Sequence, residues 1–482
     1  MNFKIPEAVM KHPEKKAARA KRFEEKQLVK LQSSSRTSGT GGYFVFLLVM
    51  IAVVNILDEI TSNLSVSVQS SFVTEFFVNR PFLGKNYTFE QGLSLHTTVS
   101  VLGYAFGAVT PFYKALADKW GRKPLFVIST LGMAAGLLII YFSPNYLVFL
   151  LGFAVISFFI GHDIQIIYIL EEAPDKKRGS VYSVLKSLGI LGVVFIPVLR
   201  RVLMGDDATL WRRIFLAPSI IGFAAALLVL LFVKDTKVFI KERTAYLSIP
   251  YEERQTLKRL EKENSKAHRN QSGVFNAVKY IFSNDDTKYL MLANIIFDAG
   301  MPAIALYFES SMHIAGMSTA DITKALFVLP IVYAALTFFS GFAADISGRR
   351  RTVLSASVMS IAGFILFAAG INKLWNPYLI GGFCGLYQGC YWIGRDYMNI
   401  MMTEKVPTDI RASVVGAVGF LTIAGLVVGY LLVIIGMLVI PVWLTCLLVA
   451  VPFVAAAAVI LKLKVSETKG ANLEATGTEK AE

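Results

Sequence analysis

The chain has 482 residues, of which 55% are hydrophobic and 17% are charged, and its mean hydropathy is +0.56. A typical soluble domain carries about 25% charged residues, so this composition excludes an ordinary soluble enzyme and a disordered scaffold. The formal net charge is +14. In a soluble protein such a charge would indicate nucleic-acid binding, whereas in a membrane protein it can record topology alone.

Long apolar segments recur along the whole chain. A helix that crosses the core of a bilayer needs roughly 20 consecutive apolar residues. The pattern predicts twelve such helices, at 43–68, 92–113, 124–142, 146–170, 179–203, 211–233, 288–311, 321–342, 352–371, 376–402, 412–438 and 440–462. We therefore predict an all-α membrane protein that crosses the bilayer twelve times.

The polar segments between these helices divide the chain into units. Residues 1–42 form a basic tail, residues 235–287 form a long polar linker, and residues 463–482 form a second tail. Six predicted helices lie in residues 43–234 and six in residues 288–462. We expect two six-helix bundles joined by the linker.

The distribution of Lys and Arg predicts the orientation. If both termini face the cytoplasm, 38 of the 48 Lys and Arg residues lie on the cytoplasmic side. Cytoplasmic loops of membrane proteins carry such an excess. We therefore expect a multi-pass protein of the cell membrane with cytoplasmic termini. Its positive charge then reflects topology and contact with the lipid bilayer, and we expect no nucleic-acid partner.

Two motifs occur in both predicted halves. Asp-x-x-Gly-Arg follows the second predicted helix at 118–122 and the eighth at 345–349, which is an offset of 227 residues. Glu-x-x-Pro-x-x-x-Arg occurs at 171–178 and again at 404–411, an offset of 233. Two motifs in the same order, at nearly one offset, indicate an internal duplication. The halves should therefore be related by pseudo-symmetry, as in many transporters.

These motifs closely resemble those of the major facilitator superfamily over about residues 43–462. The resemblance implies a secondary transporter in which two pseudo-symmetric six-helix bundles move around a central site by alternating access. The second motif is most similar to the sugar-porter and organic-solute branches. Other sugar-porter features differ, because residues 234–237 read Lys-Asp-Thr-Lys and the seventh helix lacks paired glutamines. The substrate stays open at this point.

The resemblance also implies a role in gating for the loop charges. In the superfamily such contacts hold the outward-facing state and break when the cytoplasmic gate opens. A carboxylate can cap a neighbouring helix N-terminus, and an arginine can pair with a carboxylate. The alternative is a set of ordinary surface ion pairs. The expected gating residues are Asp118, Arg122, Glu171 and Arg178 in the first half and Asp345, Arg349, Glu404 and Arg411 in the second.

Two adjacent carboxylates in the first predicted helix are candidates for proton coupling. Ionisable groups within a spanning helix are costly and usually face a cavity. Asp58 lies past the midpoint of this helix, where proton-coupled sugar porters carry an embedded Asp, so it is the first candidate. Glu59 points about 100° away and is the alternative. A fixed ion-pair or hydrogen-bonding role is the competing interpretation for both.

The other intramembrane charges predict a substrate site. Lys186 and Arg395 would attract an anion if left unpaired, whereas Asp163 could neutralise Lys186, and Asp298 or Asp396 could neutralise Arg395. Aromatic side chains could stack on an organic solute, and a histidine could bind or titrate. The predicted substrate-binding residues are His162, Asp163, Lys186, Asp298, Tyr391, Trp392, Arg395 and Asp396. His96 and Glu309 lie near the predicted outer ends of their helices, where we expect simple exposure at the interface.

The sequence therefore predicts a secondary active transporter of a small organic metabolite, for which an anion is one option, driven by proton symport. Alternatives are a sugar facilitator, a proton-coupled exporter, and a membrane sensor that keeps the fold without transport. The chain has no Walker phosphate loop, no His-Glu-x-x-His motif and no Gly-x-Ser-x-Gly motif, so we expect neither an enzyme nor a cofactor. Its three cysteines lack the spacing of a metal site, and we expect a monomer whose partners are the solute, protons and lipid.

Overall fold

A computed structural model describes residues 21–22, 24–29, 41–105, 120–160, 168, 172, 178–251, 253–254, 256, 274–406 and 411–468. These residues are almost entirely helical, and their one β-bridge joins Phe82 and Lys85. Eight of the described helices are long and apolar enough to cross a membrane. The predicted class, an all-α multi-pass membrane protein built of two six-helix bundles, is confirmed.

Described helix overlaps each predicted span of the first half, although residues 106–113 and most of residues 161–170 lie outside the described part of the chain. The half consists of α2 (Gly41–Leu64), α4 (Phe89–Ala105), α7 (Arg122–Tyr141), α8 (Tyr146–Ile160), α10 (Arg178–Gly192), α11 (Phe195–Leu199) and α12 (Leu216–Phe232). Short turns complete it: η1 (Val66–Val68), α3 (Gln69–Val73), η2 (Thr74–Val78), η5 (Arg200–Met204) and η6 (Ala208–Phe215). The linker contributes α13 (Lys237–Ser248) and α15 (Val274–Ser283).

The second half differs from prediction at its first span. That span is divided into α16 (Asp285–Asp298), α17 (Met301–Ala305) and α18 (Phe308–Ile314). Gly300 and Pro302 lie at the first break, where proline removes a backbone donor and the helix stops. Broken helices are tolerated at membrane depth where they line a cavity. The remaining helices are α19 (Thr319–Ser347), α20 (Arg349–Asn372), α21 (Pro377–Glu404), α22 (Arg411–Gly436) and α23 (Val442–Lys464).

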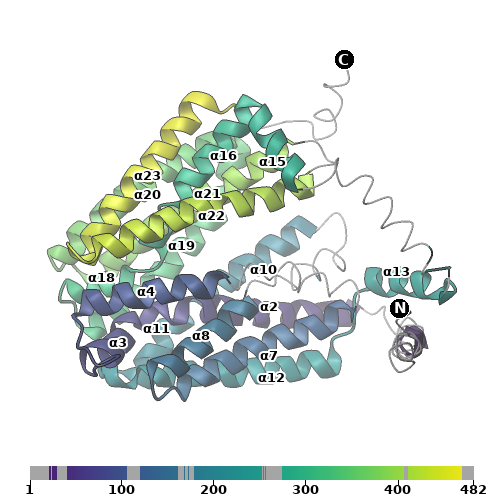
Figure 1. Ribbon diagram of the computed structural model, residues 1–482, viewed down its shortest axis with the longest axis horizontal. Coiled ribbons are helices and arrows are strands. Elements are labelled where there is room, and N and C mark those ends of the chain that lie inside the picture. Colours follow the sequence, from purple (N-terminus) through teal and green to yellow (C-terminus); the bar gives the residue numbers. More distant parts are fainter. Residues whose placement is uncertain are drawn as a thin grey trace, which may run out of the picture.

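The two halves lie one above the other in Figure 1, with α2 to α12 below and α16 to α23 above. The linker helix α13 lies at the right-hand end, which we call the linker end. The short helices α3 and α18 lie at the opposite end, which we call the far end. The two halves contact each other at the far end, where α18 packs against α3 and η1.

Small residues allow the helices of the second half to approach closely. A Cβ atom added at Gly425 of α22 would lie 1.8 Å from the carbonyl oxygen of Ile295, and one added at Gly429 would lie 2.1 Å from that of Ala299. Neither distance leaves room for a methyl group. Helix contacts in membranes depend on such close backbone packing, because lipid is as apolar as the helix surface. These two glycines therefore fix how α22 meets α16.

Replacement of Gly425 by alanine tests this contact. We expect Gly425→Ala to lower the free energy of unfolding in detergent by about 1–3 kcal/mol, because a methyl group overpacks the contact with Ile295. Gly419→Ala is the matched control on the same helix, because nothing lies within 4 Å of its added Cβ. The control should be neutral or slightly stabilising, since alanine favours helix over glycine. Equal stability of the two variants would contradict a tight contact.

Candidate functional site

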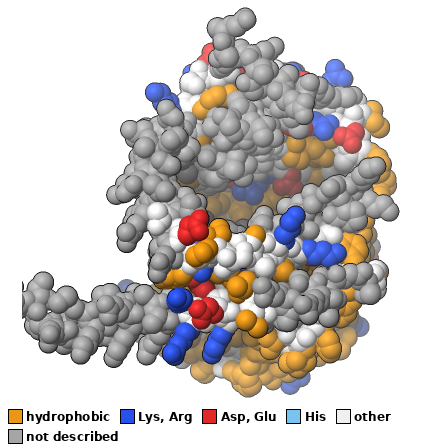
Figure 2. All heavy atoms as spheres, turned by 90° about the vertical axis from the view of Figure 1, so that its right-hand side faces the viewer, with side chains coloured by type: hydrophobic (Ala, Val, Ile, Leu, Met, Phe, Trp, Pro, Cys, Tyr) orange, Lys and Arg blue, Asp and Glu red, His pale blue; other side chains and the backbone are white. Residues whose placement is uncertain are grey.

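A cavity of about 860 Å³ lies between the two halves. Its walls come from α2 and α4, from α8 and α11, and from α17, α19 and α21 of the second half. Figure 2 shows the linker-end face of the molecule hollowed between the halves. At the far end the halves are bonded to each other by the side chains of α18. Among the described residues, the halves are therefore bonded at the far end, and the hollow between them opens at the linker end.

Hydroxyl and amide groups dominate the polar lining of this cavity. From the first half they belong to Thr61, Ser62, Asn63, Ser65, Ser67, Gln69, Thr97, Ser100 and Ser157, and from the second to Tyr307, Tyr333, Gln388 and Tyr430. Glu59 and Asp396 are the carboxylates, and no Lys or Arg is among the described lining residues. The described wall therefore offers hydrogen bonds and negative charge.

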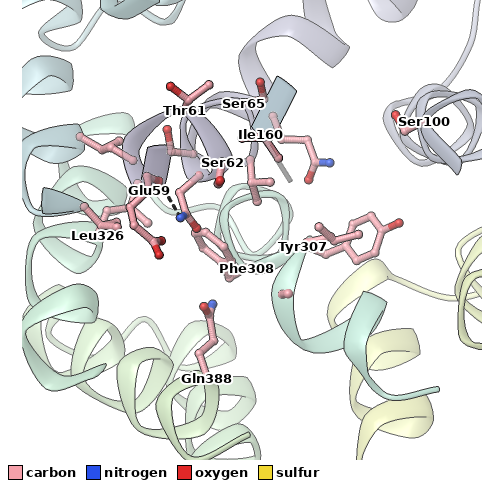
Figure 3. A pocket seen from close by; sticks show the side chains of 18 of the residues that line it. Glu59, Thr61, Ser62, Ser65, Ser100, Ile160, Tyr307, Phe308, Leu326 and Gln388 are labelled. Atoms are coloured by element: carbon pink, nitrogen blue, oxygen red, sulfur yellow. Dashed lines mark hydrogen bonds between the residues drawn. The ribbon is translucent and has the colours of Figure 1, made fainter. Parts of the chain in front are cut away.

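Side chains from both halves converge on the middle of the cavity. Figure 3 shows Glu59 and Ser62 projecting from α2 and Gln388 projecting toward them from α21. The amide of Asn63 donates to the backbone carbonyl of Glu59 at 2.9 Å, one helical turn back on α2. A solute in this space can therefore contact both halves at once, which alternating access requires.

The two proton-coupling candidates occupy different positions on α2. Glu59 lines the cavity, and its Cγ would lie 3.4 Å from a Cβ added at Gly189 of α10. Asp58 is half-buried and is not among the described lining residues. Adjacent helical positions point about 100° apart, so only one of the two carboxylates faces the cavity. The geometry favours Glu59 as the carboxylate that meets a solute.

Arg395 is paired with a buried carboxylate of its own half. Its Nε and Nη2 donate to the two carboxylate oxygens of Asp298 at 2.7 and 3.0 Å, and the Asp298 side chain is 4% exposed. The guanidinium also lies 5.3 Å from the centre of the Trp392 ring. A planar, bidentate pair of this kind neutralises both charges. Arg395 therefore joins α21 to α16, and its charge is already balanced.

The two aromatic candidates, Tyr391 and Trp392, have different surroundings. The Tyr391 ring stacks on Phe297, with ring centres 4.6 Å apart, and its hydroxyl donates to the Phe297 carbonyl at 3.2 Å. Trp392 and Asp396 lie on the side of α21 that lines the cavity. Tyr391 is thus part of the packing between α21 and α16, whereas Trp392 and Asp396 can contact a solute.

Several predicted residues cannot be placed. Asp118, His162, Asp163 and Glu171 lie outside the described residues, as do the side chains of Arg178, Lys186 and Arg411. Within the described part of the chain, no group of three or more His, Cys, Asp and Glu side chains could hold a metal ion.

The described loop charges of the second half meet at its linker end. Arg349 donates to Asp345 at 3.0 Å and to Glu404 at 3.4 Å. Glu467, which follows α23, accepts hydrogen bonds from the backbone N–H groups of Arg349 at 2.8 Å and Arg350 at 3.2 Å. A carboxylate in this position is favoured by the dipole of α20. All these contacts lie within one half, and they are present while the linker end is open.

The first half carries the corresponding cap. Asp235, which follows α12, accepts a hydrogen bond from the backbone N–H of Lys123 at 2.7 Å, at the start of α7. Gly121 precedes this helix with φ of +107°, as Gly348 precedes α20 with φ of +98°. Arg122 lies over the ring of Phe239 in α13, at 5.1 Å from its centre. In each half, a carboxylate that follows the last helix therefore caps the N-terminus of another helix, α7 in the first half and α20 in the second.

Sequence reasoning missed these two capping carboxylates, although the chain contains the signal. Residues 233–237 read Val-Lys-Asp-Thr-Lys and residues 465–469 read Val-Ser-Glu-Thr-Lys, an offset of 232. This offset agrees with those of the other two repeats. A comparison of one half with the other would therefore have identified Asp235 and Glu467 as an equivalent pair.

The expected exposure of His96 and Glu309 is wrong. His96 is 5% exposed, lines the cavity and lies 3.0 Å from the Tyr146 hydroxyl. Glu309 is 1% exposed and lies 3.8 Å from Arg200. His96 is buried because the rings of Phe72 and Tyr146 cover it, whereas the error for Glu309 comes from reading depth along a continuous helix. The break into α16, α17 and α18 instead carries Glu309 to the contact between the halves.

Comparison with known proteins agrees with this architecture. Residues 38–479 match the family model described as "Sugar (and other) transporter". The chain is 24% identical over 335 residues to the minor myo-inositol transporter IolF of Bacillus subtilis (strain 168), covering 68% of this chain and 72% of that protein. It is 25% identical over 362 residues to the multi-drug resistance efflux pump PmrA of Streptococcus pneumoniae, covering 71% and 78%.

Solved structures share the fold at low identity. A D-xylose–proton symporter superposes with a TM-score of 0.65 at 15% identity, covering 89% of this chain and 99% of that one. A bacterial homologue of the human lysosomal transporter Spinster, in an inward-facing conformation, superposes with a TM-score of 0.58 at 14% identity, covering 88% and 96%.

The Arg395–Asp298 pair can be tested by a double-mutant cycle. We expect Arg395→Gln to lower the free energy of unfolding in detergent by about 3 kcal/mol, because it leaves the Asp298 carboxylate buried without a partner. Asp298→Asn combined with Arg395→Gln should recover most of this loss. The exposed Asp321–Lys324 pair is the control, and its disruption by Lys324→Gln should cost at most about 1 kcal/mol. Additive losses in the cycle would show that the pair is not coupled.

Proposed function

The chain belongs to the sugar (and other) transporter family, and from this premise we propose that it carries a small uncharged polyhydroxylated solute through the central cavity by alternating access. The observation that carries the proposal is the lining of the cavity. It combines many hydroxyl and amide groups, contributed by both halves, with no described basic side chain.

The lining chemistry favours a polyol or sugar over an anion. Each hydroxyl of a sugar both donates and accepts hydrogen bonds, as do the Ser, Thr, Asn and Gln side chains of the wall. Trp392 supplies an apolar ring on which a sugar face can pack. Arg395, the cation that would favour an anionic solute, is neutralised by Asp298. A volume of about 860 Å³ is ample for a solute of this size.

The described conformation corresponds to one limit of the transport cycle. Under the orientation that the Lys and Arg distribution favours, the linker end faces the cytoplasm, so the cavity is open inward. The capping carboxylates Asp235 and Glu467 keep each half rigid, and the opposite limit then arises when the halves rock about the solute.

We assign proton coupling to Glu59, with Asp58 as the alternative. Glu59 lies in the cavity wall, where it meets both the solute and water entering from the open end. A carboxylate in a partly dry site can exchange a proton near neutral pH. Bound proton and bound solute would then favour the same closed intermediate, which is the basis of symport.

A second candidate function is export of apolar compounds. The same cavity has an apolar side, formed by Phe72, Phe153, Ile156, Leu326 and Leu329. The similarity to an efflux pump agrees with that surface. An amphipathic drug could occupy it without using the hydroxyl groups.

Uptake into proteoliposomes distinguishes these functions. We expect accumulation of a pentose, a hexose or an inositol when a proton gradient is imposed, and little transport of organic anions or apolar dyes. Glu59→Gln should abolish gradient-driven accumulation while keeping solute exchange, because exchange needs binding but no net proton transfer. Asp58→Asn should keep gradient dependence if Glu59 is the carrier.

The matched control is Ser62→Ala, which changes an uncharged lining residue of the same helix. This variant should change the affinity for the solute by a small factor and leave the gradient dependence intact. Transport of dyes but no sugar would favour export. Full coupling in Glu59→Gln, with loss of coupling in Asp58→Asn, would transfer the proton role to Asp58.

A further inference from the structure

A thin partition separates the central cavity from a second cavity at the far end. The second cavity has a volume of about 400 Å³, and its charged lining residues are Glu75, Arg80, Arg200, Arg212, Glu309 and His313. Ser67, Gln69 and Phe308 line the central cavity, whereas Ser70 and Glu309, their neighbours in the chain, line the second. Residues of α3 and α18 therefore face both cavities and form the partition between them.

A buried carboxylate of the second half closes this partition. The Glu309 carboxylate accepts a hydrogen bond from the Ser70 backbone N–H at 2.8 Å and one from the Ser70 hydroxyl at 2.5 Å. Ser70 lies on α3, in the first half. Both acceptors are oxygens of one ionised group, and such charge-assisted bonds are stronger than neutral ones.

Arg200 of the first half provides the balancing charge. Its Nη1 lies 3.8 Å from Glu309 Oε1 and donates to the backbone carbonyl of Ser67, while its Nε donates to Thr323 of α19 at 3.1 Å. The side chains of Arg200 and Glu309 are each 1% exposed. An unpaired buried charge is strongly destabilising, so removal of either Arg200 or Glu309 would leave the other in an unfavourable environment.

Neutral hydrogen bonds flank the charged pair on the same short helix. Ser310 donates to Gln69 at 2.7 Å, and Tyr307 donates to Thr97 at 2.8 Å. Both of these bonds, like those between Ser70 and Glu309, join the two halves. They exist only while the far end is closed, so their free energy stabilises the state that is open at the linker end.

We propose that the Arg200–Glu309 pair is the lock of the far gate and that a proton on Glu309 releases it. A proton from water in the second cavity would convert the carboxylate into a neutral carboxylic acid. The acid loses its charge attraction to Arg200, and the hydrogen bonds that it accepts from Ser70 lose their charge-assisted strength. The far gate then opens, and loss of the proton restores the lock.

Neighbouring elements place other polar and titratable groups close to the Arg200–Glu309 pair. Arg200 faces Glu309 from η5, His313 lies one turn further along α18, and Thr323 faces Arg200 from α19. Exposed Asp321 and Lys324 of α19 pair with each other, and buried Cys446 lies on α23, which packs against α18.

Arg80, Arg212 and Glu75 line the second cavity beside the pair. Burial raises the pKa of Glu75, but hydrogen bonds from Arg212 and Trp211 outweigh it and leave this pKa below its usual value. Glu75 therefore stays ionised to lower pH than an ordinary glutamate, and it offers a comparison for Glu309 within the same cavity.

The proposal rests on the proposed transport function but assigns Glu309 a separate task. Glu59 faces the cavity that is open at the linker end, whereas Glu309 adjoins the cavity at the far end. A group that takes and returns its proton on one side moves no net proton. Glu309 thus sets the balance between the two conformations, and acid on the far side favours the state that is open there.

Labelling of a cysteine in the central cavity from the far side tests the lock. Ser62→Cys provides the reporter, because Ser62 is exposed within the cavity, and the three native cysteines are buried. Arg213→Cys, an exposed far-end position, verifies which side an impermeant maleimide reaches in proteoliposomes. We expect Glu309→Gln to raise far-side labelling at Ser62→Cys about tenfold, as loss of a charged bond of this type would shift the equilibrium.

The pH dependence separates a proton-sensitive lock from a static one. Far-side labelling of the otherwise unaltered protein should rise as the far-side pH falls, whereas labelling of Glu309→Gln should be high and independent of pH. Glu75→Gln is the matched control, because its partners Arg212 and Arg80 lie in the same half. It should leave both the labelling rate and its pH dependence unchanged.

Three outcomes would overturn the proposal: normal labelling in Glu309→Gln, an equal rise in Glu75→Gln, or pH-independent labelling of the unaltered protein. If Glu309→Gln does not fold, Ser70→Ala decides instead, because it removes only the hydroxyl donor. Far-side labelling of Ser62→Cys must then rise in the Ser70→Ala variant, and no rise would overturn the proposal. The assay uses no solute, so failure of the uptake screen and failure of the lock are recognised separately.

Discussion

Within the bilayer, a charged side chain is stable when it pairs with an opposite charge or when it faces a water-filled cavity. The described charges of this chain follow that division. Buried Asp298 is paired with half-buried Arg395, and Glu309 and Arg200 form a buried pair. Glu59 and Asp396 line the central cavity. The same constraint forces every backbone group into a helix except where the chain lines a cavity, as at the break before α17.

The two buried pairs have different mechanical consequences because of where they lie. The Asp298–Arg395 pair joins helices within one half, as do the caps provided by Asp235 and Glu467. Such contacts lie within one half, so a movement of one half relative to the other need not break them. The Arg200–Glu309 pair joins one half to the other, so any separation of the halves at the far end would break it. The described structure therefore has buried or part-buried ion pairs of two kinds, one within a half and one between the halves.

Sequence reasoning succeeded where one physical rule acts locally. The spans followed from the length that a bilayer requires, and the repeats indicated two related halves. It left the partner of Arg395 open between Asp298 and Asp396, since both lie at a similar depth. It was wrong about Glu309, because a hydropathy pattern does not register the break around Gly300 and Pro302. It missed Asp235 and Glu467 by comparing their segments with a family pattern and not with each other.

The sequence by itself determined the all-α, multi-pass class and the division into two six-helix halves, since these follow from apolar length and repetition along the chain. It also predicted an orientation from charge counts. Only the tertiary structure decided which charges meet. Glu309 contacts Ser70 across 239 positions of sequence. Such an encounter depends on the rotation of each helix about its axis and on the register between the halves, which no pattern along one helix contains. For the same reason, the faces of α2 and α21 that line the cavity became known only when the two halves were packed together.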